Sequence, residues 1–167
     1  DAISSHSYPN HGFIGTPDDS GWHSIRGYEN ELSFLKDLGI NRDYPVFITE
    51  TGWPHKEGTQ IANNYYDCDT AASYYKKALE IWQQDDRIQA VTPFIYNYAS
   101  DPFDHFSWLD PQGKLYSSYQ QIINMPKSQN SPDQLTRYTL VDIRLPIIIF
   151  TNSQANGTIT IKNTGQS

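Results

Sequence analysis

Short apolar runs alternate with amphipathic stretches along the first 125 residues. Ile3, Phe47 and Val91 each mark such a run, and both intervals are 44 positions. Each interval holds one loop and one stretch whose apolar residues recur at spacings of three and four, the pattern of an amphipathic helix. A fixed alternation of strand and helix is typical of parallel βα units. The pattern therefore predicts an α/β fold with three parallel strands.

The central predicted strand lies in residues 45–55, which read PVFITETGWPH. The run is apolar and β-branched, as a buried parallel strand is, but it ends on the carboxylate of Glu50 before a Gly/Pro turn. An ionised carboxylate is costly in apolar surroundings unless it has partners. Ligand chemistry in parallel α/β sheets gathers at the carboxyl ends of strands. Glu50 is therefore a candidate functional group, and the alternative is a rim glutamate that points into water.

The two flanking strands are shorter and interrupted by proline. Residues 2–9 predict a strand that stops at Pro9 and places His6 and Tyr8 on one face at its end. Residues 90–98 predict the third strand, in which Pro93 lacks one ladder donor.

Three helices are expected between and after these strands. The first begins at about Ser20 or Gly21 and stops at Gly39, the second is capped by Asp67 or Asp69, and the third covers residues 116–125. Their expected inward stripes are Ile25, Tyr28, Leu32, Leu35 and Leu38 on the first helix, and Ala71, Ala72, Tyr75, Ala78, Leu79 and Trp82 on the second.

The composition changes after residue 125. Residues 126–132 (PKSQNSP) predict a polar linker, and residues 133–167 contain short apolar runs. Residues 157–163 alternate like a half-buried strand. We expect the truncated start of an antiparallel β-sandwich here.

Charge and length exclude several classes of partner and site. The chain has 167 residues, a net charge of −7 and a pI near 5.0, which argues against nucleic acid and anionic membranes as partners. No apolar run reaches 18 residues, so no membrane-spanning helix is expected. The single Cys68 and five histidines without helical i, i+4 spacing predict neither a metal site nor a metal cofactor.

Three segments together resemble a known enzyme family. Residues 4–9 (SSHSYP), 47–54 (FITETGWP) and 93–98 (PFIYNY), followed by WLD at 108–110 and GKLY at 113–116, resemble strands six to eight of a clan A retaining glycoside hydrolase. The most specific part is ITETGWP, which is similar to the nucleophile strand of these TIM (β/α)₈ barrels. ITIKNTGQS at 159–167 resembles the immunoglobulin-like modules often appended to them.

The resemblance implies that Glu50 is the catalytic nucleophile, which forms a glycosyl-enzyme that water then hydrolyses with retention. The acid/base would lie at the end of strand four, in an upstream barrel half that these residues do not include. Tyr8 or His6 would donate a hydrogen bond to Glu50, the alternative for Tyr8 being a core tyrosine. The remaining substrate-binding candidates are Trp53 and Trp108, which would stack on a sugar ring or else pack the loops, and Tyr96, Asn97 and Tyr98 at the end of the third strand.

Two functions remain open from the sequence. The first is part of a retaining glycosidase that takes part in polysaccharide or oligosaccharide degradation. The second is a noncatalytic carbohydrate-binding or scaffold protein that keeps the barrel cleft. Because residue 1 is Asp and only three of eight repeats are present, we expect a piece of a longer protein. The resemblance implies an extracellular or cell-surface location, no cofactor and a carbohydrate substrate.

Overall fold

The structure is a computed structural model, and it describes residues 1–9, 11–126, 138–146 and 151–164. The chain divides into two compact units, Asp1–Pro126 and Lys127–Ser167. Each unit is described by itself. Within the described residues, no helix is both long and apolar enough to cross a membrane.

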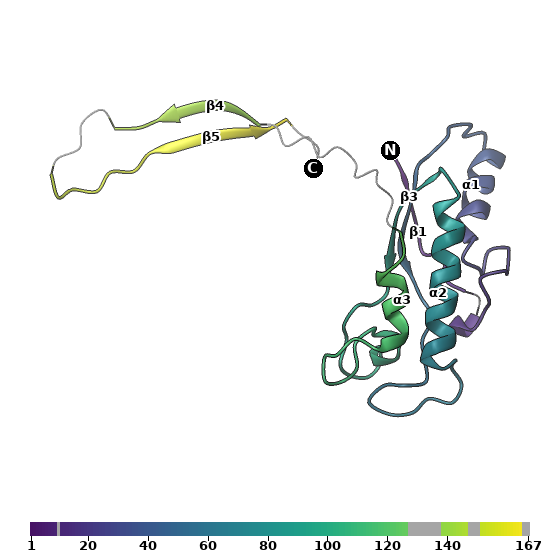
Figure 1. Cartoon of the computed structure of the whole chain (residues 1–167). Helices are drawn as coiled ribbons and strands as arrows, with labels where there is room; N and C mark the ends of the chain where they lie inside the picture. Colours follow the sequence, from purple (N-terminus) through teal and green to yellow (C-terminus); the bar gives the residue numbers. More distant parts are fainter. Residues whose placement is uncertain (10, 127–137, 147–150, 165–167) are drawn as a thin grey trace. The chain divides into compact units, whose positions relative to one another are not determined.

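The first unit is built on a parallel three-stranded sheet (Figure 1). Its strands are β1 (Ile3–Ser5), β2 (Val46–Thr51) and β3 (Ile88–Pro93), in the order β1-β2-β3. Ile3 pairs with Val46, and Phe47 pairs with Ala90. The prediction of three parallel strands at a regular interval is confirmed, with β2 in the centre.

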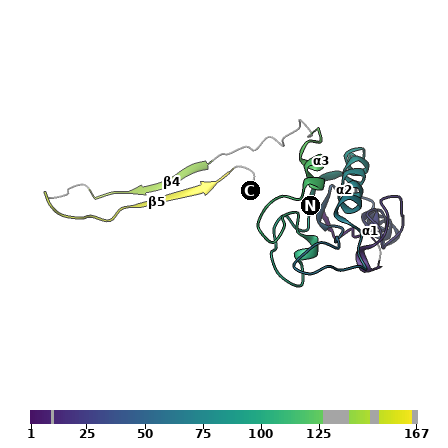
Figure 2. The same ribbon diagram turned by 60° about the horizontal axis from the view of Figure 1, so that its bottom comes forward.

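Three α-helices accompany the sheet: α1 (Gly27–Asp37), α2 (Cys68–Gln83) and the short α3 (Gln120–Ile123). Figure 1 and Figure 2 both show α2 between α1 and α3. The side chain of Asp67 accepts a hydrogen bond from the backbone N–H of Thr70 at 2.8 Å, which confirms Asp67 as the N-cap of α2. Single 3₁₀ turns lie at His11–Phe13, Asp104–Phe106 and Ser117–Tyr119.

Four predicted boundaries were wrong. The first strand, predicted over residues 2–9, covers only Ile3–Ser5, since the Tyr8 N–H turns back onto the His6 carbonyl at 3.0 Å. Helix α1 begins at Gly27, because Gly21 adopts a positive φ of 92° and the Ser24 hydroxyl closes a turn onto the Gly21 carbonyl. Leu38 follows the helix and is exposed. The third strand starts at Ile88 and ends at Pro93, so residues 94–98 form a loop that begins with a cis Phe94–Ile95 peptide bond. The last helix is also shorter than predicted, since a 3₁₀ turn replaces its first half.

One face of the sheet supports the core of this unit. Val46 and Ile48 of β2 are fully buried in one cluster with the inward stripe of α2. The indole N–H of Trp82 donates to the Ile25 carbonyl at 3.1 Å, so the end of α2 is tied to the segment before α1. From the predicted stripe of α2, the structure buries Ala71, Ala72, Tyr75, Ala78 and Trp82 and leaves Leu79 half-buried.

The opposite face of the sheet is open. Ser4, Phe47 and Ala90 lie side by side in the register of the three strands, and all three are exposed. The hydroxyls of Ser4 and Thr49 bond to each other on adjacent strands at 2.8 Å. The parallel sheet therefore has one covered and one uncovered face among the described residues.

The second unit contains an antiparallel pair, β4 (Tyr138–Arg144) and β5 (Thr158–Asn163). Nearly every described residue of the pair is exposed. The predicted strand at 157–163 is confirmed, whereas the sandwich as a whole stays a prediction. Most of the predicted linker lies outside the described residues, as do residues 147–150 of the short apolar run at 146–150.

Candidate active site

Glu50 lies at the carboxyl end of β2 and is partly exposed, with 34% of its side chain accessible. The Tyr8 hydroxyl donates to Oε1 of Glu50 at 2.6 Å. Nδ1 of His6 lies 3.2 Å from Oε2. Both partners come from the segment that follows β1, the neighbouring strand. The structure thus brings together the three residues that the sequence placed at adjacent strand ends, and each carboxylate oxygen has one polar partner.

Tyr8 is held in an aromatic setting. Its ring makes edge contacts with Phe13 and Phe106, at centroid distances of 4.9 and 6.5 Å. Burial, together with the hydrogen bond to Glu50, raises the pKa of Tyr8 well above its usual range. The phenol therefore stays protonated at physiological pH and remains a donor to the carboxylate.

The backbone on the carboxyl side of Glu50 is fixed from both neighbouring segments. The buried hydroxyl of Thr51 donates to the Ser7 carbonyl at 2.7 Å, and the Phe94 N–H donates to the Thr51 carbonyl at 2.7 Å. Gly52 follows, where a Cβ would lie 2.6 Å from the Phe94 carbonyl and would also clash with the Tyr75 hydroxyl. Glu50 is consequently presented by a rigid strand end rather than by a free loop.

The interpretation of Trp53 and Trp108 as sugar-stacking walls was wrong for this chain. Trp53 is fully buried, and its indole N–H donates to the Gly15 carbonyl at 2.7 Å. Trp108 is 8% exposed and stacks on Tyr119 at 4.9 Å. Both rings pack the loops, which was the stated alternative, because the loop after β1 and the segment before α3 fold back over them.

The segment that follows β3 keeps its aromatic residues accessible. Tyr96 is 60% exposed, Asn97 is exposed, and Tyr98 contacts Phe103 edge-on at 5.5 Å. The described hydrogen bonds place none of these side chains on Glu50. Their role in binding a substrate stays a prediction.

Two aspartates after β3, Asp104 and Asp110, act as structural residues. Asp104 is buried, and its Oδ2 accepts from the N–H and the hydroxyl of Thr59 at 2.7 and 2.6 Å. Asp110 accepts from the backbone N–H groups of Gln112 and Lys114, as a turn-forming aspartate does. Neither is joined to Glu50 by the described hydrogen bonds, so neither of these two carboxylates is placed beside Glu50.

A second polar cluster was missed by the sequence analysis. His55, Glu57 and Cys68 bring one nitrogen, one carboxylate oxygen and one sulfur within 4.8 Å of one another. Burial lowers the pKa of His55 and raises that of the Cys68 thiol to about 12. Because 13 positions separate His55 from Cys68, helical spacing could not have revealed the cluster.

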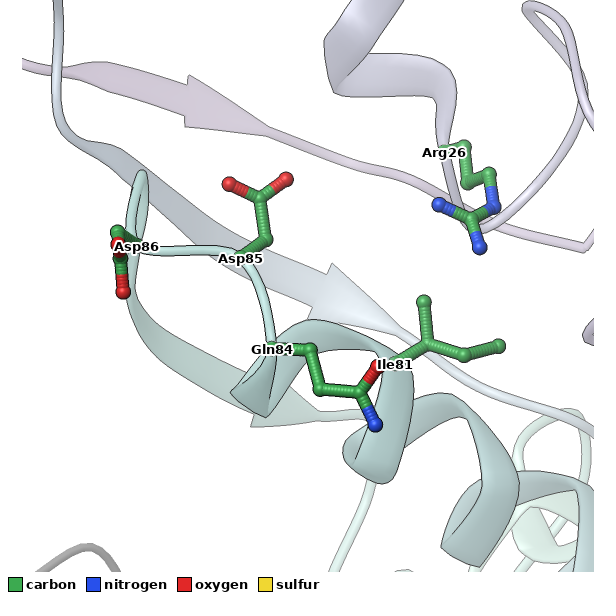
Figure 3. Close-up of a pocket in the computed structure, with 5 residues that line it drawn as sticks. All are labelled: Arg26, Ile81, Gln84, Asp85 and Asp86. Carbon is green, nitrogen blue, oxygen red and sulfur yellow. The ribbon is translucent and has the colours of Figure 1, made fainter.

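A surface pocket of about 400 Å³ lies near the amino ends of the strands, whereas Glu50 lies at the carboxyl end of β2 (Figure 3). Ile81 and Gln84 line it from the end of α2, Asp85 and Asp86 from the following turn, and Arg26 from the residue before α1. The turn precedes the amino end of β3, and the Arg87 carbonyl accepts from the Val46 N–H at 2.7 Å. The pocket is therefore separate from Glu50, which occupies the carboxyl end of β2.

No protein-family model and no curated protein sequence matches the chain. Among solved structures, it is similar to a β-glucuronidase from Ruminococcus gnavus in complex with uronic deoxynojirimycin, with 13% identity and a TM-score of 0.47 over 72% of this chain. A β-glucuronidase from Faecalibacterium prausnitzii gives 13% identity and a TM-score of 0.46 over 75% of this chain. The chain spans 22% of the length of either enzyme. Similarities of this size do not establish a shared fold.

Proposed function

We propose that this chain is the carboxyl-terminal part of a retaining glycoside hydrolase, with Glu50 as its nucleophile. The observation that carries the proposal is the arrangement of Glu50 at a strand's carboxyl end, with Tyr8 at 2.6 Å and His6 at 3.2 Å on its two oxygens. A nucleophilic carboxylate must be ionised and aimed at the anomeric carbon. The Tyr8 hydrogen bond on one oxygen and the His6 ring on the other fix the direction of this carboxylate.

The open face of the sheet supports the larger architecture. Parallel sheets are almost always covered on both faces. Here Ser4, Phe47 and Ala90 form an exposed row on one face. In a closed (β/α)₈ barrel this face would line the interior, and the missing strands would pair with the free edges of β1 and β3. The upstream barrel half is the partner that this proposal requires.

In the proposed reaction, Glu50 attacks the anomeric carbon and displaces the leaving group, and water then hydrolyses the glycosyl-enzyme. Tyr8 holds the attacking carboxylate in place while it is ionised. The acid that protonates the leaving group belongs to the upstream half, so we expect the 167-residue chain alone to be inactive. General acid help of this kind is typically worth about 10²- to 10⁴-fold in rate.

The test uses a protein that carries the complete barrel. Glu50→Gln keeps the size of the side chain and should lower turnover of an aryl β-glycoside by several orders of magnitude. Azide added to Glu50→Ala should restore part of the turnover, because it replaces the nucleophile. Glu80→Gln on the exposed face of α2 is the matched control and should retain full activity.

Residual activity above about a tenth of wild type in Glu50→Gln would contradict the assignment, since a tenfold loss corresponds to only about 1.4 kcal/mol. The noncatalytic carbohydrate-binding alternative would be favoured by two results together. The complete protein would show no turnover, and its Glu50→Gln variant would still bind sugar.

A further inference from the structure

We propose that His55, Glu57 and Cys68 form a binding site for a divalent transition-metal ion of the zinc type. The site is distinct from Glu50 and does not depend on its function. His55 and Glu57 lie near the start of the loop between β2 and α2, and Cys68 is the first residue of α2. The thiol, imidazole and carboxylate are the three side-chain groups that zinc uses most.

The imidazole of His55 is oriented as that of a metal ligand. The ring is fully buried, and Nε2 lies 2.8 Å from the Ser107 carbonyl. A carbonyl oxygen can only accept, so Nε2 carries the proton in this contact. The neutral ring then has its lone pair on Nδ1. Histidines that bind metal commonly donate their other ring N–H to a backbone carbonyl in this way, which fixes the tautomer.

Nδ1 of His55 has no hydrogen-bond partner among the described residues although it is buried. It lies 3.5 Å from Oε2 of Glu57. A lone pair facing a carboxylate oxygen at this distance is unfavourable without a positive charge between them. A cation at this point would satisfy both atoms.

The carboxylate and the thiol complete the donor set. Oε2 of Glu57 also accepts from the backbone N–H of Cys68 at 3.0 Å, which fixes the carboxylate at the start of α2. Cys68 is almost fully buried. Tetrahedral zinc, with bonds of about 2.0 to 2.3 Å, separates its ligand atoms by roughly 3.3 to 3.7 Å. The cluster, within 4.8 Å, needs a contraction of about 1 Å.

Two other roles for His55, Glu57 and Cys68 explain fewer of these observations than a metal site does. A Cys–His nucleophile pair needs an accessible thiolate, whereas Cys68 is buried. A His55–Glu57 ion pair would place a charged imidazole in a fully buried position and gives Cys68 no role. Sulfur and imidazole donors also select against Mg²⁺ and Ca²⁺, which prefer oxygen ligands.

Co²⁺ titration of the full chain tests the site, after chelator treatment and with the thiol kept reduced. We expect one equivalent to bind with a cobalt–thiolate charge-transfer band, and Zn²⁺ to abolish the band by displacement. Cys68→Ser should eliminate the band. Glu57→Gln, at a partly exposed position, should keep the band but weaken Co²⁺ binding by about 10- to 100-fold or more.

Surface histidines provide the control. His11 and His23 are exposed, with their rings 4.0 Å apart, and could bind Co²⁺ adventitiously. The double variant His11→Gln/His23→Gln should leave the thiolate band and its titration unchanged. Absence of the band in wild-type chain that is folded by circular dichroism would overturn the proposal. So would a band that survives in Cys68→Ser, or Co²⁺ binding that is lost only in the histidine double variant.

Discussion

The strands β2 and β5 have similar apolar alternation but opposite surroundings. Val46 and Ile48 of β2 are fully buried, whereas Ile159 and Ile161 of β5 are each 58% exposed. Helix α2 packs in one core cluster with β2, while the described part of the second unit contains only the β4–β5 pair. Burial therefore comes from a second layer of structure and not from the strand pattern alone. A two-stranded hairpin without such a layer is marginally stable.

The largest expected effect is on the free energy of unfolding, and it tests the difference in burial between β2 and β5. Ile48→Ala should lower the free energy of unfolding of the full chain by about 2 to 5 kcal/mol, because it leaves a cavity in a packed core. Ile161→Ala, the same change on an exposed strand, should alter it by less than about 0.5 kcal/mol. Urea denaturation of both variants measures the difference. Equal losses would contradict the burial assigned to the two strands.

A smaller effect is expected at Gly52, directly after the strand end that carries Glu50. A methyl group there would meet the Phe94 carbonyl at 2.6 Å and the Tyr75 hydroxyl. Gly52→Ala should therefore cost about 1 to 3 kcal/mol of stability through overpacking. Denaturation of this variant beside wild type measures the cost. A neutral effect would mean that the contact between β2 and the segment after β3 is looser than described.

The smallest of the three effects concerns Asp85, in the turn that leads into β3. The hydrogen bonds from Arg87 hold the pKa of Asp85 well below its usual range, against burial, which raises it, and the Tyr28 hydroxyl adds a further bond at 2.7 Å. A depressed folded-state pKa gives stability that is fully present above the unfolded value of about 3.9 and is lost as the pH falls toward the folded value. Asp85→Asn should therefore cost about 1 to 2 kcal/mol at pH 6 and less at pH 3.

Urea midpoints at pH 6 and pH 3 measure this pH dependence. Asp86→Asn, in the same turn but exposed, is the matched control and should keep the wild-type profile. Parallel profiles for wild type and Asp85→Asn would show that Asp85 is not the group responsible.

The sequence predicted the features that depend on local pattern. The parallel strands follow from the regular interval, the N-cap from Asp67, and the approach of Tyr8 and His6 to Glu50 from their places at adjacent strand ends. The environment of Trp53 could not be predicted, because its burial depends on a loop that returns to place the Gly15 carbonyl on the indole N–H.

The cluster of His55, Glu57 and Cys68 could not be predicted from the sequence either. No helical or strand period relates these positions, and their approach depends on how the loop before α2 folds. Two elements are also shorter than their apolar patterns: β3 ends at Pro93, and the positive φ of Gly21 precedes a later start of α1. Sequence periodicity therefore located the elements better than it located their ends.

The central claim is that Glu50 is a nucleophile, and covalent trapping tests it most directly. A 2-deoxy-2-fluoro glycoside with an activated leaving group should form a stable glycosyl-enzyme in a protein that carries the complete barrel, because the fluorine slows hydrolysis of the intermediate. Peptide mass spectrometry should then find one added sugar, on Glu50. Labelling at another carboxylate, or turnover of the glycoside with inversion, would contradict the account.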